Sequence, residues 1–393
     1  MAVTTRSKLP VDGVSIFATM TRLANELGAI NLSQGFPDFD CEPALVDAVT
    51  HYMRAGHNQY APMPGVLALR EALATKIERL YGRRYDPATE ITITTGATEA
   101  IFAALTALVH PGDEVVLFQP VYDSYVPAVE LSGGRPVFIT LRAPEFRIDW
   151  DAVRRAVTSR TRVIVLNSPH NPTGMIWSQD DFAQLERVLQ HTDAVIVSDE
   201  VYEHILFDGA RHESVARYPA LAERAMVISS FGKTYTTTGW KVGYCAAPPA
   251  LTALLQGVHQ WIVFSVNGAV QMAYADAVRQ DPECRGVTAF YQRKRDLFLS
   301  LVADTRFRPL HTRGTFFQLL DYSDIASTRD EEFAVWLTRT HGVASIPLTP
   351  FLNGGESAVR IVRFCFAKRD ETLSAAAERL RAVGRVPVDP PCV

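Results

Sequence analysis

The sequence is poor in cysteine and has no long apolar run. Its five cysteines are scattered over 393 residues, and no pair has the spacing of a metal site or a disulfide framework. No stretch of about 18 uninterrupted apolar residues is present, so no transmembrane helix is expected. Residues 1–10 lack the apolar segment and cleavage site of a signal peptide. We therefore expect a cytoplasmic protein without a metal centre or membrane attachment.

Concentrated positive charge is also missing. The formal net charge is −4, and the densest basic run, residues 293–295, lies in a helical pattern that predicts a solvated face. A nucleic-acid partner is not expected, because its phosphates need a larger basic surface. No Gly-x-Gly-x-x-Gly motif follows a predicted strand, which argues against a nicotinamide-dependent dehydrogenase.

The length and the hydrophobic pattern predict an α/β protein with two domains. A chain of 393 residues exceeds one comfortable core, and 47% hydrophobic with 21% charged residues is ordinary globular composition. Strands rich in Val and Ile alternate with helical stretches, which predicts a mostly parallel, seven-stranded type of sheet flanked by helices. The expected strands are residues 91–95, 115–118, 137–140, 163–167, 195–198, 226–230 and 242–246.

The last hundred residues show a different pattern, typical of a smaller α+β domain. Helices are expected near 288–303, 330–341 and 370–383, with strands at 315–320 and 359–366. Another helix is expected near 16–28. We predict an N-terminal arm, residues 1–41, that forms part of the small domain, a large domain over 42–290, and the C-terminal small domain over 291–393.

Polar residues follow several of the expected strands, where open α/β sheets bind ligands. The turn after the first strand, residues 95–99, either binds a phosphate at a helix N-terminus or is an ordinary N-cap by Thr95. Asn171 lies in a loop fixed by two prolines and a glycine, which either projects its amide or is a plain turn. Asp199 ends a buried strand and needs a partner, such as a helix cap, a cation or a protonated pyridine nitrogen.

Lys233 follows the strand at 226–230 and precedes a loop rich in Thr and Gly. A lone lysine is usually a surface cation. This one is placed to enter a cleft, where desolvation lowers the pKa of the amine and permits Schiff-base chemistry. An aspartate after one strand and a lysine after the next is what pyridoxal 5′-phosphate (PLP) requires, because the carboxylate keeps the pyridinium protonated and the lysine holds the aldehyde.

Seven motifs carry a resemblance to a known family: Leu32-Ser-Gln-Gly-Phe-Pro-Asp-Phe39, Asn58-Gln-Tyr60, Asn171-Pro-Thr-Gly174, Ser198-Asp-Glu-Val-Tyr202, Ser230-Phe-Gly-Lys233, Thr238-Gly-Trp-Lys-Val-Gly243 and Arg363-Phe-Cys-Phe366. The chain resembles the fold-type I, class I/II PLP-dependent aminotransferases from Ile16 to about Leu380. It looks closest to the branch of methionine and kynurenine/glutamine aminotransferases.

The resemblance implies a role for each matching residue on the cofactor. Lys233 would be the catalytic Schiff-base lysine and proton shuttle, and Asp199 would pair with the pyridine nitrogen. Asn171 and Tyr202 would bond the phenolic oxygen, and Tyr122 would stack on the ring. The remaining cofactor residues implied are phosphate ligands: Ala97, Thr98, Ser230, Lys241 and, from the neighbouring subunit of a homodimer with shared active sites, Tyr60.

The resemblance also implies the substrate site, for an amino acid and a 2-oxo acid in a ping-pong reaction. Arg363 would bind the α-carboxylate together with Asn171 and the N–H of Gly35. Aromatic residues around the side chain favour an apolar or sulfur-containing donor, with methionine first and aromatic amino acids or glutamine next; they are Phe17, Phe36, Tyr60, Tyr122 and Phe264.

Two positions depart from patterns found in relatives. Some relatives have arginine at the position of Lys241, so the contact with the phosphate would be a point charge here. Some kynurenine-active relatives have tryptophan near Phe17.

Other reactions fit parts of the pattern. A kynurenine aminotransferase or a cysteine-S-conjugate β-lyase would use the same lysine. Ser230 and Lys233 also match the Ser-x-x-Lys motif of acyl transferases, but no Lys-Thr-Gly or Lys-Ser-Gly follows, and a strand leads into the serine. A non-catalytic PLP-binding regulator would need a DNA-binding domain for which the chain has no room.

Overall fold

A computed structural model describes residues 8–9, 15–353 and 360–384. The Pro-rich segment at residues 387–391 lies outside them. Within the described residues, no helix combines the length and the apolar character that a membrane span requires.

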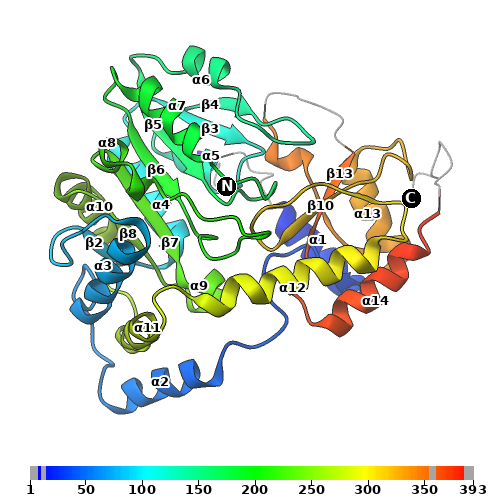
Figure 1. Cartoon of the computed structure of the whole chain (residues 1–393), viewed down its shortest axis with the longest axis horizontal. Helices are drawn as coiled ribbons and strands as arrows, with labels where there is room; N and C mark the ends of the chain where they lie inside the picture. The colour runs from blue at the N-terminus through cyan, green and yellow to red at the C-terminus, as the bar shows by residue number, and fades with distance from the viewer. Residues whose placement is uncertain (1–7, 10–14, 354–359, 385–393) are drawn as a thin grey trace, which may run out of the picture.

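A seven-stranded sheet forms the centre of the larger part of the molecule (Figure 1). The strand order is β2-β8-β7-β6-β5-β3-β4. Among these described strands, β8 is antiparallel to its neighbours β2 and β7, and the other pairs are parallel. The strands are β2 (Ile91–Thr94), β3 (Glu114–Gln119), β4 (Arg135–Thr140), β5 (Thr161–Asn167), β6 (Val195–Asp199), β7 (Ala225–Ser230) and β8 (Gly243–Ala246). All seven strands predicted from the sequence are therefore confirmed.

Burial explains why these strands carry Val and Ile on both faces. Helices flank the sheet, so β3 is buried along its whole length and β6 along nearly all of it. The helix α4 (Gly96–Leu108) packs along β5–β8 and contacts α5 and α10. The other helices of this part are α2 (Pro43–Arg54), α3 (Leu67–Tyr81), α5 (Tyr125–Leu131), α6 (Trp150–Ala156), α7 (Gln179–Leu189), α8 (Pro219–Ala222), α9 (Phe231–Thr234), α10 (Pro249–Ile262) and α11 (Gly268–Gln280).

The C-terminal part is built on a second, antiparallel sheet in the order β12-β13-β10-β9. Its strands are β9 (Arg308–Pro309), β10 (Phe317–Asp321), β12 (Ile346–Pro347) and β13 (Ile361–Cys365). The α-helices described in this part are α12 (Arg285–Val302), α13 (Asp330–His341) and α14 (Asp370–Arg381). The α+β pattern predicted for the last hundred residues is confirmed, with ends shifted by a few residues.

The N-terminal segment joins this C-terminal part. Ser15 caps α1 (Ile16–Leu27) by accepting the backbone N–H of Phe17, and Gly28 ends the helix at φ 60°. The strand β1 (Ile30–Asn31) pairs in parallel with β11 (Val343–Ala344). This pairing agrees with an arm that belongs to the small domain, while the domain boundaries at 41/42 and 290/291 stay a prediction; α12 begins at residue 285, before the second of them.

Candidate active site

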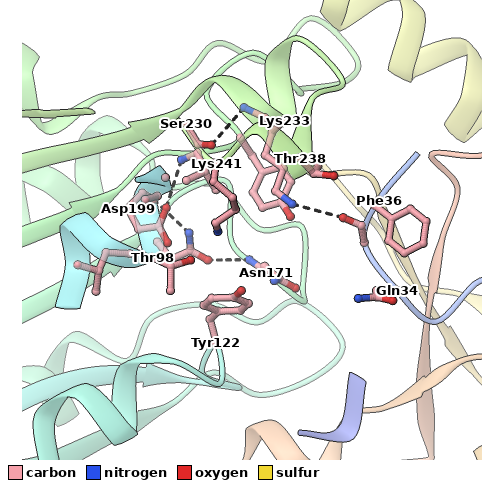
Figure 2. Close-up of a pocket in the computed structure, with 18 of the residues that line it drawn as sticks. Gln34, Phe36, Thr98, Tyr122, Asn171, Asp199, Ser230, Lys233, Thr238 and Lys241 are labelled. Carbon is pink, nitrogen blue, oxygen red and sulfur yellow. Dashed lines mark hydrogen bonds between the residues drawn. The ribbon is translucent and has the colours of Figure 1, made fainter. Parts of the chain in front are cut away.

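A cavity of about 380 Å³ lies at the carboxyl ends of the parallel strands, where N-terminal and C-terminal segments also meet. Almost every residue proposed from the sequence lines it: Phe17, Gly35, Phe36, Ala97, Thr98, Tyr122, Asn171, Asp199, Tyr202, Ser230, Lys233, Lys241 and Arg363. Figure 2 shows Asp199, Asn171 and Lys241 around one hollow, with the ring of Tyr122 beside it. The sheet topology therefore brings together residues up to 346 positions apart in sequence (17 to 363).

Lys233 enters the cavity from α9, the short helix that directly follows β7. Ser230 caps this short helix by accepting the N–H of Gly232. The Lys233 ammonium donates to the carbonyl of Gly35 at 3.3 Å. Burial, with the neighbouring charges of Lys241 and Arg363, lowers the pKa of Lys233 to about 8. A lysine with this pKa is partly neutral near physiological pH, as a nucleophile toward an aldehyde must be.

Asp199 ends β6 and is only 4% exposed. Burial raises the pKa of its carboxyl group to about 6, although hydrogen bonds from the Tyr125 hydroxyl and the Val201 N–H oppose the rise. The nearest residues provide no arginine or lysine partner at salt-bridge distance within the described residues. The carboxylate is therefore placed to accept a further donor from the cavity.

The N-terminus of α4 faces the same cavity. Thr95 occupies the N-cap position, as one of the two interpretations predicted, but its side chain makes no capping hydrogen bond within the described residues. The side chain of Glu99 instead accepts the N–H of Thr95. The Lys241 ammonium lies close to Gly96, 3.3 Å from the point where a Cβ would be. Free backbone N–H groups and an adjacent cation form a site suited to a phosphate.

Arg363, on β13, is fully buried and held in one orientation. Its two terminal nitrogens donate to the Asn171 side-chain oxygen and to the Ser33 carbonyl, both at 2.9 Å. The guanidinium stacks on Phe317, with Cζ 3.8 Å from the ring centroid, and Phe17 lies 5.0 Å from it. Burial lowers the pKa of Arg363 to about 10, so it stays cationic at neutral pH. Within the part of the chain that the structure describes, the buried Nε has no hydrogen-bond partner, so it can bind an anion.

Gly35 fits because the backbone passes directly over Phe317. A Cβ at this position would lie 2.6 Å from the Phe317 ring and 3.3 Å from Phe316. A larger residue would therefore push the segment carrying Gln34 and Phe36 away from Arg363. The role predicted for the Gly35 N–H stays a prediction.

Tyr60 and Phe264 do not reach the cavity of their own chain. Tyr60 is 85% exposed, and its ring packs edge-on against Phe264 at 5.6 Å. Both lie on an outer surface next to a second hollow of about 390 Å³ formed by residues 53, 57–60 and 265–268. This placement fits the expectation that Tyr60 acts on a neighbouring subunit, and it removes Phe264 from the substrate wall of one isolated chain.

Several lining residues were not predicted from the sequence, namely Gln34, Gly96, Ile101, Asn167, Val201, Gly232, Thr238, Gly239, Val242 and Phe317. Most are chain neighbours of predicted residues, which is a signal that could have found them. Phe317 is different, because it reaches Arg363 only through the pairing of β10 with β13.

The chain belongs to the class I and II aminotransferase family, whose model matches residues 28–380. It is therefore an aminotransferase, and the acyl transferase and dehydrogenase alternatives are wrong.

Individual relatives share nearly its whole length. The chain is 50% identical to a methionine aminotransferase of Escherichia coli, over 96% of this chain and 97% of the relative. An E. coli structure identified with a methionine aminotransferase function matches with a TM-score of 0.94 at 49% identity, over 97% of this chain and all of the other. A probable N-succinyldiaminopimelate aminotransferase of Mycobacterium tuberculosis is 39% identical (98% and 99% covered), and a kynurenine–oxoglutarate transaminase of Dictyostelium discoideum 33% (94% of each).

Proposed function

We propose that the protein is a PLP-dependent aminotransferase that takes the amino group from methionine or a similar apolar L-amino acid and transfers it to a 2-oxo acid. One observation carries the cofactor: Lys233, Asp199 and the uncapped N-terminus of α4 face a single cavity. These three supply an amine for the aldehyde, an anion for the pyridinium and donors for the phosphate. When bound, PLP supplies an electron sink that stabilises negative charge at the substrate Cα.

The other residues that line the cavity would position the cofactor and the substrate. Asn171 and Tyr202 are placed to bond the phenolic oxygen, and Tyr122 to pack on the ring; Ala97, Thr98, Ser230 and Lys241 would hold the phosphate. Arg363 binds the α-carboxylate and so aims the Cα–H bond toward Lys233. With the cofactor and substrate bound, the free Lys233 amine would take the proton from the substrate Cα and deliver it to the cofactor carbon that carries the aldehyde. Its lowered pKa suits both directions of that proton transfer.

Two observations support an apolar donor. Phe17, Phe36 and Phe317 line the cavity beside Arg363, and an apolar wall favours a side chain such as methionine's flexible thioether. The acid Asp123, close enough to Arg363 to feel its charge, accepts a hydrogen bond from Ser15 and offers no positive charge to a second carboxylate. The 50% identity to the E. coli methionine aminotransferase supports the same donor. Kynurenine aminotransferase activity is the second candidate, and the 33% identity to the kynurenine–oxoglutarate transaminase supports it less. A β-lyase reaction would use the same lysine.

Borohydride reduction of the PLP-loaded protein, followed by peptide mapping, tests the cofactor assignment. We expect the label on Lys233 alone. A Lys241→Ala variant should bind PLP more weakly yet carry the label at the same place, since Lys241 would contact only the phosphate. Label on another lysine, or no label, would contradict the assignment.

We further propose a homodimer that shares its active sites, in the reducing cytoplasm. Tyr60 and Phe264 pack together on the surface, and nearby segments of the chain expose further large apolar side chains: Leu67, Trp261 and Ile262. Trp261 alone is 84% exposed. Sedimentation should show a dimer, and Trp261→Asp should dissociate it and reduce PLP affinity, because Tyr60 of the neighbour would leave the phosphate. A fully active monomer would contradict this arrangement.

A further inference from the structure

The carboxylate of Asp199 is held from behind by a residue that does not line the cavity. One of its oxygens accepts the hydroxyl of Tyr125, and the other accepts the N–H of Val201 at 3.2 Å. The adjacent backbone carbonyl of Asp199 accepts the side-chain amide of Asn167 at 3.1 Å. These bonds fix the orientation of the carboxylate before any cofactor arrives.

Tyr125 can only be the donor in this pair, because an ionised carboxylate has acceptors alone. Burial raises the pKa of the Tyr125 hydroxyl well above its ordinary value, and the negative charge of Asp199 acts in the same direction. The hydroxyl therefore keeps its proton over the whole working range of pH. Tyr125 is 3% exposed and begins α5, three residues after Tyr122, whose ring packs against it at 5.6 Å.

We infer that Tyr125 is a positioning residue for the proposed PLP chemistry: its hydroxyl holds the Asp199 carboxylate oriented and ionised toward the pyridine nitrogen. The inference rests on the proposed function. One short segment would then contact the cofactor in two ways. Tyr122 would pack on the face of the pyridine ring, and Tyr125 would act on the ring nitrogen through Asp199.

The expected consequence of losing the hydroxyl follows from competition for one proton. Without a donor, the Asp199 carboxylate is more basic and takes the proton from the pyridinium. The ring then loses its positive charge, so the linkage between Lys233 and the cofactor holds its own proton more tightly. The other ionisable groups near Asp199 are Glu200, Lys233, Tyr122 and Tyr202, and none of them donates a hydrogen bond to its carboxylate within the described residues.

The test compares Tyr125→Phe with Tyr81→Phe. Tyr81, on α3, also donates from a buried hydroxyl to a buried carboxylate, that of Glu203, but it lies outside the cavity. Each variant thus loses one buried hydrogen bond to a charged group. The readouts are the pH titration of the visible band of the holoenzyme, the PLP dissociation constant and the thermal unfolding of the apoprotein.

In Tyr125→Phe we expect the titration midpoint to rise by about one pH unit and PLP binding to weaken about tenfold. Tyr81→Phe should leave both unchanged. A titration and an affinity like wild type in Tyr125→Phe would overturn the inference. If wild type itself failed to fix PLP at Lys233, the proposed function would fall instead.

A double-mutant cycle covers the case in which Tyr125→Phe folds poorly. In an Asp199→Asn background the hydroxyl has no carboxylate to orient, so Tyr125→Phe should weaken PLP binding less than twofold further. Fully additive losses of PLP affinity would show that Tyr125 acts on the fold and not through Asp199.

Discussion

The two walls of the cavity differ in how they are built. The wall that faces the proposed cofactor comes from the ends of β5, β6 and β7 and from α4, and its residues Asn167, Asn171 and Asp199 are buried and hydrogen-bonded within one chain. The wall beside Arg363 comes from the arm at residues 17–36 and from β10, and its outer part is open: Phe36 is 38% exposed. The rigid sheet thus sets the chemistry, whereas segments from elsewhere set the choice of donor.

Lys233→Ala should produce the largest effect. Without the amine, no covalent link to PLP forms and no group moves the Cα proton, so kcat should fall by about 10⁴-fold or more. Turnover of methionine with a 2-oxo acid measures this. The thermal stability of the apoprotein serves as the control and should hardly change, because the buried ammonium lies in a strongly desolvated position. Full activity would remove Lys233 from the mechanism.

Asp199→Asn should reduce kcat by about 10²- to 10³-fold, the scale of a lost buried charge pair. The apoprotein should show the opposite trend. Burial raises the pKa of Asp199 to about 6, above the ordinary value of 3.8 that holds in the unfolded chain. Between these two values the unfolded chain ionises before the folded one, so the free energy of unfolding falls as the pH rises, and the fall is complete above about pH 6. At pH 8 the Asn variant of the apoprotein should therefore melt at the same temperature or higher. Calorimetry of the apoprotein and kinetics of the holoenzyme together check this; a variant within a few-fold of wild-type turnover would refute the role of Asp199.

Arg363→Lys should reduce kcat/KM about 10- to 100-fold for every donor alike, because lysine can neither form the planar fork nor stack on Phe317 in the same way. The affinity for PLP should stay near wild type, which separates the two walls. Arg360→Lys is the matched control, since Arg360 is exposed, stands three residues earlier and does not line the cavity. A loss restricted to one donor would mean that Arg363 binds side chains instead.

The sequence predicted the cofactor wall better than the substrate wall. Asp199 and Lys233 each follow a strand that the Val and Ile pattern marks plainly, and the ends of parallel strands must meet at one edge. Phe317 could not be predicted, because its contact with Arg363 depends on the register in which Leu319 pairs with Arg363. The contact between Tyr125 and Asp199 was not predicted, because the pattern around a tyrosine in a helix indicates only a core position. The fold alone brings the two residues together. The missing capping bond from Thr95 to α4 could not be predicted either, because it depends on the direction of the threonine side chain.

The most direct test of the account is the half-reaction of the PLP-loaded enzyme with single amino acids. L-Methionine, L-phenylalanine, L-glutamine and L-aspartate would each be mixed with the holoenzyme, and the rate of conversion of PLP to its amino form would be followed by absorbance. We predict that methionine is at least about tenfold better than aspartate in kcat/KM, since a well-fitted apolar group gains roughly 1–3 kcal/mol, while desolvating a second carboxylate against Phe17, Phe36 and Phe317 costs more than that. Aspartate equal to or better than methionine would contradict the proposed substrate wall, and no conversion with any of the four would contradict the proposed function itself.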